Sequence, residues 1–315
     1  MEAPQSGRSG PEQGGSRGWG NKRISRRTAL KASGTALATL GLAGMASALS
    51  SGAAAGGQVT GTPTTPSSRA TEDNMVTKPT ILLLHGAWAD GSNWDGVVRR
   101  LQRDGYTVDS LPNPLRGVAG DSAYLASFLQ TVPGPIVLVG HSYGGAVITN
   151  AATGNTQVKA LVYVDAFIPD QGDTVLQLVG AVPGSHLGGD PTTVFNFVPY
   201  PGAAPGDADL YVKTSIYPDA FTNGLPPATG AVLAATQRPL TLSSFAEPSG
   251  VPAWKSIPSW CFVGTEDNVI PPAELLAMGQ RANAHIVQVA APHLSMIARP
   301  DDVTELIERA ARAAE

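Results

Sequence analysis

Short runs of apolar residues alternate with helically spaced apolar residues along the chain from residue 79 onward. Runs such as PTILLLHG (79–86) and PIVLVG (135–140) are almost continuously apolar, which is typical of strands buried on both faces of a sheet. The six expected strands span 79–86, 106–111, 135–140, 158–167, 258–264 and 284–290. Helical spacing predicts helices over 94–103, 123–129, 145–152 and 303–313. This alternation predicts an α/β fold in which a mostly parallel sheet carries helices on both faces.

Residues 170–250 interrupt the alternation. They are rich in Pro and Gly, and they show no clear pattern of a buried strand. A segment of this length inside a compact domain is either functional or disordered. Its aromatic residues, such as Phe195, Tyr211 and Phe221, favour an ordered cap over the carboxyl edge of the sheet, which is where open α/β sheets bind ligands.

The first 55 residues have the features of an export signal. Seven basic and two acidic residues give this segment a charge of +5, and SRRTALK (25–31) is similar to the twin-arginine export motif. An apolar stretch follows over 32–49, and small residues suited to signal peptidase lie at 46–48 and at 53–55. We therefore expect a twin-arginine signal over 1–55 and a protein that is secreted or held in the cell envelope.

Two further parts follow the expected signal. Residues 56–78 are rich in Gly, Thr, Pro and Ser, which predicts a flexible linker. The remaining residues, 79–315, are enough for one sizeable folded domain that includes the cap.

Charge and cysteine content limit the partners. The precursor has a formal net charge of −4, and removal of the basic signal leaves −9, which disfavours nucleic acid and anionic membranes as partners. The apolar stretch of the signal is short and diluted by small polar residues, so it makes a poor membrane span. Cys261 is the only cysteine, so there is no internal disulfide and no cysteine for a lipid anchor at the signal. We expect no stable membrane anchor, and the oligomeric state stays open.

A possible nucleophile lies in GHSYGG (140–145). This stretch contains Gly140-x-Ser142-x-Gly144, the pattern of a sharp turn from a strand to a helix that exposes one serine hydroxyl. The same pattern around Ser16 has no strand before it and no helix after it. Because Ser142 follows an expected strand and precedes an expected helix, we interpret Ser142 as the nucleophile.

A serine nucleophile needs a base, and the base needs an orienting acid. His293 follows the last expected strand and is the best placed base, whereas His85 and His141 have the features of structural residues. Asp267 lies in the turn after another strand and completes the order Ser, Asp, His that is associated with this kind of turn. Asp165, which also follows a strand, and Glu266 are the alternative acids.

Attack by a serine creates a negative oxygen, which fixed N–H donors stabilise. One expected donor is the backbone N–H of Tyr143, the residue after the nucleophile. The other is the N–H of Ala87, in the loop after the first strand. This chemistry requires no metal and no organic cofactor.

The motifs LLLHGAW, GHSYGG, YVDAFIP, GTEDNVIPP and PHLSMIARPDDV make the chain from Pro79 onward similar to the α/β-hydrolase superfamily. The resemblance is to the branch that contains small capped esterases, methylesterases and hydroxynitrile lyases. It implies an eight-stranded, mostly parallel sheet with a helical cap inserted after the sixth strand. Because few residues precede Pro79 in the expected domain, the two outermost leading strands are expected to be missing or irregular.

Two positions separate reactions within this branch. The lyases typically have threonine where this chain has Gly86, and lysine where it has Leu294, so the resemblance favours ester hydrolysis. Dehalogenases of the superfamily have aspartate in place of Ser142. The expected function is a serine carboxylesterase that cleaves small or medium ester substrates through an acyl-enzyme. A hydroxynitrile lyase, a lactonase, thioesterase, amidase or perhydrolase, and a binding protein without activity are the alternatives.

Overall fold

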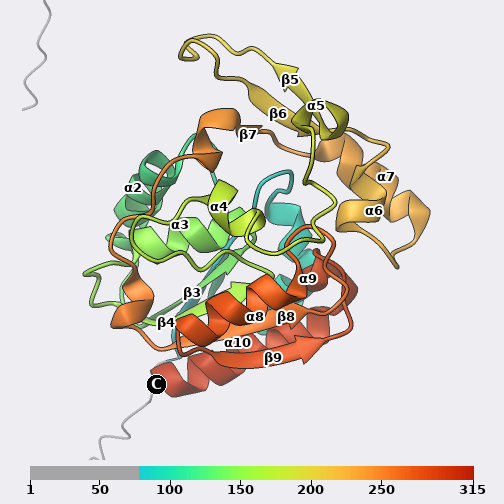
Figure 1. The fold of residues 1–315 in the computed structure, drawn as a ribbon. Helices are drawn as coiled ribbons and strands as arrows, with labels where there is room; N and C mark the ends of the chain where they lie inside the picture. The colour runs from blue at the N-terminus through green and yellow to red at the C-terminus, as the bar shows by residue number, and fades with distance from the viewer. Residues whose placement is uncertain (1–77) are drawn as a thin grey trace, which may run out of the picture. The chain divides into compact units, whose positions relative to one another are not determined.

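The computed structural model describes residues 78–315, which include the whole expected folded domain (Figure 1). The predicted export signal and all of the linker except Lys78 lie outside the described residues. Among the described helices, none is both long and apolar enough to span a membrane.

All six expected strands form one sheet, in the order β2-β1-β3-β4-β8-β9. Their bounds are β1 Thr80–Leu84, β2 Val108–Leu111, β3 Ile136–His141, β4 Val158–Val164, β8 Ser259–Gly264 and β9 His285–Val289. Every neighbouring pair in this sheet is parallel. The residues of the four central strands are almost all buried, whereas β2 and β9 at the edges are partly exposed. The α/β class and the parallel sheet are therefore confirmed.

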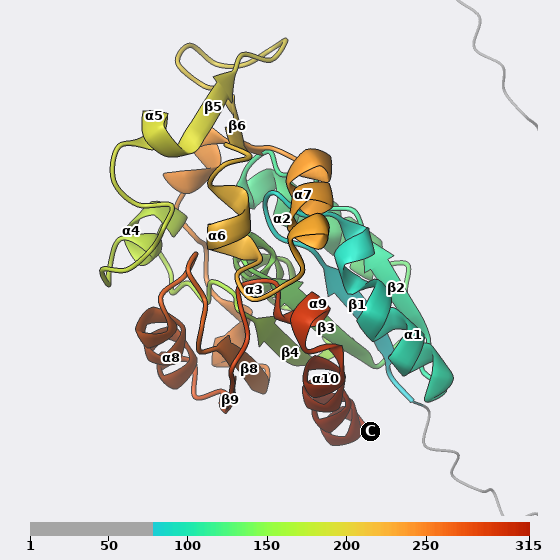
Figure 2. The same ribbon diagram turned by 90° about the vertical axis from the view of Figure 1, so that its right-hand side faces the viewer.

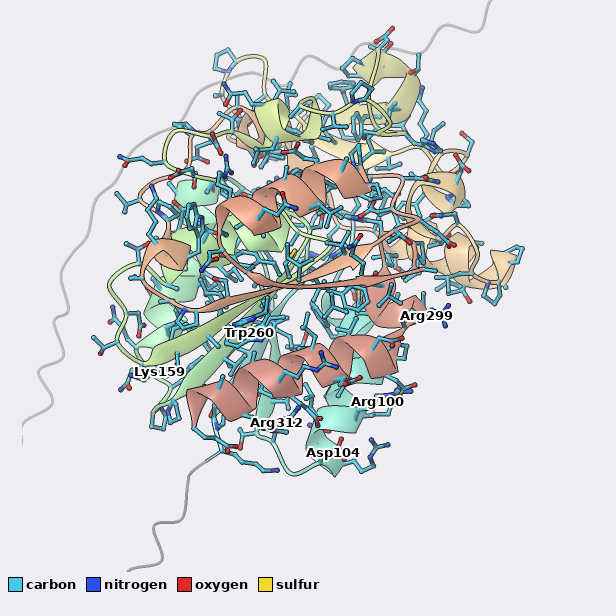
Figure 3. All side chains as sticks on the ribbon, turned by 60° about the horizontal axis from the view of Figure 1, so that its bottom comes forward. Arg100, Asp104, Lys159, Trp260, Arg299 and Arg312 are labelled. Atoms are coloured by element: carbon cyan, nitrogen blue, oxygen red, sulfur yellow. The ribbon has the colours of Figure 1, made fainter. Side chains whose placement is uncertain are left out.

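Helices cover both faces of this sheet (Figures 1 and 2). One face carries α1 (Asp95–Arg103) and α10 (Pro300–Ala314), and the other carries α2 (Val118–Leu129), α3 (Tyr143–Ala151) and α8 (Pro272–Arg281). A 3-10 turn, η1 (Gly91–Trp94), precedes α1, and the short α9 (Ser295–Ala298) precedes α10. In the view of Figure 3, Arg100 of α1 lies beside α10, where it pairs with Asp301.

Helices α3 and α10 begin two and three residues earlier than predicted, and two other helices differ more from the prediction. Helix α2 begins five residues before the expected start, because the Asp121 carboxylate accepts the N–H groups of Arg116 and Gly117 and so fixes the turn that starts the helix. Helix α8 was not predicted. Its prolines at the first turn and its buried Leu275 and Met278 were the available signals.

The segment between β4 and β8 folds as the cap, and it contains strands as well as helices. In chain order it comprises α4 (Val175–Val179), α5 (Pro191–Val194), β5 (Phe195–Val198), β6 (Asp209–Val212), α6 (Tyr217–Phe221), α7 (Pro227–Thr236), β7 (Leu240–Thr241), η2 (Leu242–Phe245) and η3 (Ala253–Lys255). Strands β5, β6 and β7 pair as an antiparallel sheet. The cap is helical as expected but also contains three strands that were not predicted, because strands of two to four residues are too short to show a sequence period.

The described residues supply six strands to the main sheet rather than eight, so the cap follows the fourth of these described strands. In the same views the cap covers one end of the sheet (Figures 1 and 2). That end carries the carboxyl ends of the parallel strands, since Ser142 follows β3 and lines the cavity that the cap covers.

Candidate active site

Ser142 lies in a strained turn between β3 and α3. Its backbone φ of 52° and ψ of −123° place it in a region that residues with a side chain rarely adopt. The turn fits only because glycines surround it. A Cβ added at Gly140, Gly144 or Gly145 would approach neighbouring backbone atoms to 2.7, 2.9 and 2.4 Å, respectively. The GHSYGG sequence is thus required by the close approach of β3, α3 and the loops beside them.

His293 and Asp267 meet below the cap. The Nδ1–H of His293 donates to Asp267 Oδ2 over 2.7 Å, and both side chains are fully buried. The other carboxylate oxygen of Asp267 accepts the N–H groups of Val269 at 2.7 Å and Ile270 at 2.9 Å. These bonds fix the imidazole in the tautomer that carries its proton on Nδ1, so Nε2 has a free lone pair.

The Nε2 atom of His293 is buried and has no hydrogen-bond partner among the described residues. No hydrogen bond joins it to Ser142 Oγ among these residues. Contacts of this kind are often long in free enzymes and shorten when substrate binds. Burial lowers the pKa of His293, which keeps the imidazole neutral and able to accept a proton near neutral pH.

The two alternative acids do not bond to His293. Asp165 is buried at the end of β4, where its Oδ1 accepts the N–H of Gly264 over 2.6 Å. Burial, together with the nearby charge of Asp267, holds the pKa of Asp165 well above its usual range. Glu266 is exposed. Of the three candidate acids, Asp267 alone is paired with the imidazole. Burial raises the pKa of Asp267 as well, whereas the hydrogen bonds from the N–H groups of Val269 and Ile270 lower it.

The other buried histidines hold loops of the site. His85 accepts the N–H of Asn113 at Nε2 over 3.1 Å, so its Nδ1–H donates to the carbonyl of Gly86 over 2.9 Å. His141, the residue before Ser142, donates from Nε2 to the carbonyl of His293 over 3.0 Å. Burial lowers the pKa of both imidazoles, so both are neutral.

The two expected oxyanion donors lie at the same end of the cavity as Ser142. The N–H of Tyr143 is the first of α3 and has no acceptor within the helix, and the N–H of Ala87 bonds to no other described residue. A Cβ at Gly86 would lie 2.6 Å from Ser142 Cβ, so the loop that carries Ala87 packs directly against the turn of Ser142. The sequence did not reveal that the Tyr143 hydroxyl also anchors this turn, by donating to Asp121 Oδ2 over 2.9 Å.

A cavity of about 580 Å³ extends from these groups into the cap. Ala87, Ser142 and Tyr143 line one part of it, and apolar cap residues line most of the rest. Asp207 is the one charged residue among the described residues that line it, and its carboxylate is already bonded to Tyr200 and Ser243. Within residues 78–315 no three His, Cys, Asp or Glu side chains are grouped in a way that could hold a metal ion.

Aromatic residues form one wall of the cavity, which the sequence analysis did not identify. The indole of Trp88 stacks on Phe195 with ring centroids 5.4 Å apart and lies 6.1 Å from the ring of Phe245. Trp88 follows Ala87 directly, whereas Phe195 and Phe245 come from the cap. Sequence distance hides such a cluster, because Trp88 lies more than 100 residues before both of its cap partners along the chain.

Comparison with known proteins identifies similar chains of the same fold. A carbendazim hydrolyzing esterase of Nocardioides sp. is 32% identical over 112 residues, a match that spans 31% of this chain and 46% of that relative. A pyrethroid hydrolase of Sphingobium wenxiniae is 26% identical over 251 residues, which cover 74% of this chain and 87% of the relative. The crystal structure of polyneuridine aldehyde esterase superposes with a TM-score of 0.64 at 17% identity, over 74% of this chain and 99% of that one.

The sequence model of the alpha/beta hydrolase family matches residues 81–306, from the first strand of the sheet into the last helix. This match spans the strained serine turn, the cap and the buried Asp–His pair. The chain therefore belongs to the alpha/beta hydrolase family.

Proposed function

We propose that this protein hydrolyses carboxylic esters through an acyl-enzyme formed on Ser142. The observation that carries the proposal is the buried bond between His293 and Asp267, which leaves the other imidazole nitrogen without a partner among the described residues. The same ring packs against His141, the residue before Ser142 in the strained turn, with ring centroids 4.7 Å apart. This arrangement fits a nucleophile, a general base and an orienting acid. The esterase and hydrolase names of the two curated relatives support the same reaction class.

In the proposed reaction, Ser142 Oγ forms a bond to the ester carbonyl carbon while His293 Nε2 takes the hydroxyl proton. The N–H groups of Ala87 and Tyr143 stabilise the negative oxygen of the tetrahedral intermediate. The bond to the alcohol then breaks, and His293 returns the proton to the departing alcohol. Water attacks the acyl-enzyme by the same route in reverse, which releases the acid and restores Ser142. Asp267 stays ionised and stabilises the imidazolium that forms at His293.

We assign a neutral, largely apolar ester of small or medium size as the substrate. The cavity is lined mostly by aliphatic and aromatic side chains, and its one charged residue, Asp207, is negative and already bonded to neighbouring groups. A cavity of about 580 Å³ lies in the range that accepts substrates of drug-like size. A carboxylate on the substrate would lose its hydration without gaining a cationic partner, so charged esters are expected to be poor substrates.

Turnover of nitrophenyl esters of increasing acyl length tests the reaction. We expect the wild-type protein to release nitrophenol and the Ser142→Ala variant to lose at least about a thousandfold of this rate. Undiminished turnover in that variant would rule out Ser142 as the nucleophile. Cyanide release from mandelonitrile without ester hydrolysis would instead indicate the lyase reaction. Export by the twin-arginine route stays a prediction from residues 1–55.

A further inference from the structure

We propose that α6 of the cap, together with Asn223 just after it, positions the three loops that perform the proposed reaction. The oxyanion loop is defined as Gly86–Trp88, the acid loop as Glu266–Asn268 and the base loop as His293–Leu294. The inference rests on the proposed function, and it assigns to α6 a role that its place in the cap does not reveal. No residue of α6 lines the cavity, so its contacts with these loops are not contacts with substrate.

The oxyanion loop is held by the cap through Trp88. Its carbonyl accepts the hydroxyl of Tyr217 over 2.8 Å, and its indole N–H donates to the carbonyl of Leu210 over 2.8 Å. The backbone N–H of Trp88 donates to the carbonyl of Arg238 over 3.0 Å. These bonds hold a backbone with φ of 55°, which is unfavourable for tryptophan. Because Ala87 precedes Trp88 directly, the bonds also fix the direction of the Ala87 N–H.

The acid loop is tied to the cap on both sides of Asp267. The side-chain amide of Asn223 donates to the carbonyl of Glu266 over 2.8 Å. The side-chain amide of Asn268 donates to the carbonyl of Asp219, in α6, over 3.0 Å. The chain therefore has little freedom to move Asp267 away from His293 while the cap is in place.

The base loop touches the same helix. The ring of Phe221 meets the His293 imidazole edge to face, with centroids 5.4 Å apart, and its carbonyl accepts the N–H of Leu294 over 3.4 Å. Phe221 in turn stacks on Tyr217 at 4.4 Å, and both side chains are fully buried. Helix α6, which has five residues, thus contacts the oxyanion loop, the acid loop and the base loop, although these loops are far apart in sequence.

Positioning of this kind predicts a loss in kcat rather than in substrate binding. Reacting groups must meet within a fraction of an ångström, and a misplacement of about 1 Å costs about a hundredfold in rate. The Tyr217→Phe variant removes one hydroxyl and keeps the stacked ring. Tyr211→Phe on β6 is the matched control, because it removes the same group from another cap tyrosine, whose hydroxyl bonds to no described residue.

The test measures kcat and KM on the best nitrophenyl ester, with active sites counted by end-point labelling with a fluorophosphonate. For Tyr217→Phe we expect kcat to fall about tenfold while KM stays within about twofold. The affinity for a trifluoromethyl ketone analogue, which forms a tetrahedral adduct on the serine, should fall in parallel. If the variant only yielded less folded protein, the number of labelled active sites would fall, but kcat per active site and the affinity for the ketone analogue would not change.

Asn223→Ala provides a second variant, since it removes a single partly exposed contact to the acid loop. We expect kcat to fall at least about threefold in this variant as well. Values of kcat and of ketone affinity equal to those of wild type and of Tyr211→Phe in both variants would overturn the inference alone. A wild-type protein that neither reacts with the fluorophosphonate nor cleaves esters would overturn the proposed function, and the inference with it.

Discussion

At the residue scale, Asp267 and Asp165 are two similarly placed carboxylates, of which only Asp267 bonds to the catalytic imidazole. Each follows a strand of the sheet, at the ends of the neighbouring strands β8 and β4, and each is buried. Asp267 accepts the Nδ1–H of His293, whereas Asp165 accepts a backbone N–H of Gly264. Asp165 makes no bond to the imidazole, and the oxygen of an amide could still accept the Gly264 N–H, so asparagine should replace Asp165 with little change in rate.

The variants Asp267→Asn and Asp165→Asn test this difference. An amide at 267 cannot stabilise the imidazolium and favours the wrong tautomer of His293, so kcat should fall at least about a thousandfold. The same change at 165 should leave kcat within about tenfold of wild type. Ester turnover at saturating substrate measures both effects. The opposite ranking would assign the acid to Asp165.

The sequence predicted Ser142, His293 and Asp267 because each follows a strand, and strand ends are visible as limits of apolar runs. It left Asp165 open because the choice depends on where the imidazole points. It did not reveal the links from Trp88 and from the Tyr143 hydroxyl, because their partners, Leu210 and Asp121, are set by the packing of separate elements.

At the element scale, the cap supplies most of the cavity wall and thereby sets which esters fit. Val179 ends α4, is partly buried and lines the cavity, whereas Val232 of α7 is 61% exposed and does not line it. The cap was expected from its aromatic content, but its three short strands and its helices were not located. The cap strands are stabilised by pairing with one another, and they are too short to show a period of apolar residues from which they could be predicted.

A tryptophan at each of these valines separates a cavity effect from a general effect on the cap. Val179→Trp should raise KM for a bulky nitrophenyl ester about tenfold or more and leave KM for the acetate within about threefold, because only the larger acyl group needs that space. Val232→Trp should leave both values unchanged. Equal losses on both esters in the first variant would contradict the assignment of this wall.

At the scale of the whole molecule, the parallel sheet buries histidines that titrate freely when the chain unfolds. Burial lowers the pKa of His85, His141 and His293, so below about pH 6.5 the unfolded chain binds protons that the folded chain does not. The stability contribution of each neutral imidazole is therefore complete above that pH and is lost as the pH falls. Asp165 and Asp267, whose pKa values burial raises, act in the opposite direction.

Comparison of wild type with His141→Gln isolates one histidine from these opposing effects. Well below pH 6.5 each buried histidine costs about 1.4 kcal/mol of unfolding free energy per pH unit, so the wild type should lose stability on acidification more steeply than the variant by about this amount. Urea unfolding between pH 7.5 and pH 5 measures the two slopes. Parallel pH dependences would show that His141 is protonated in the folded protein.

The most direct test of the proposed reaction is the mass of the protein after it meets a slowly hydrolysed nitrophenyl ester. We predict that rapid acid quenching traps a species heavier by one acyl group and that peptide mapping places this group on Ser142. We also predict that the Ser142→Ala variant stays at its original mass. An acyl group on another residue, or full ester turnover by a protein that never gains mass at Ser142, would contradict the proposed acyl-enzyme.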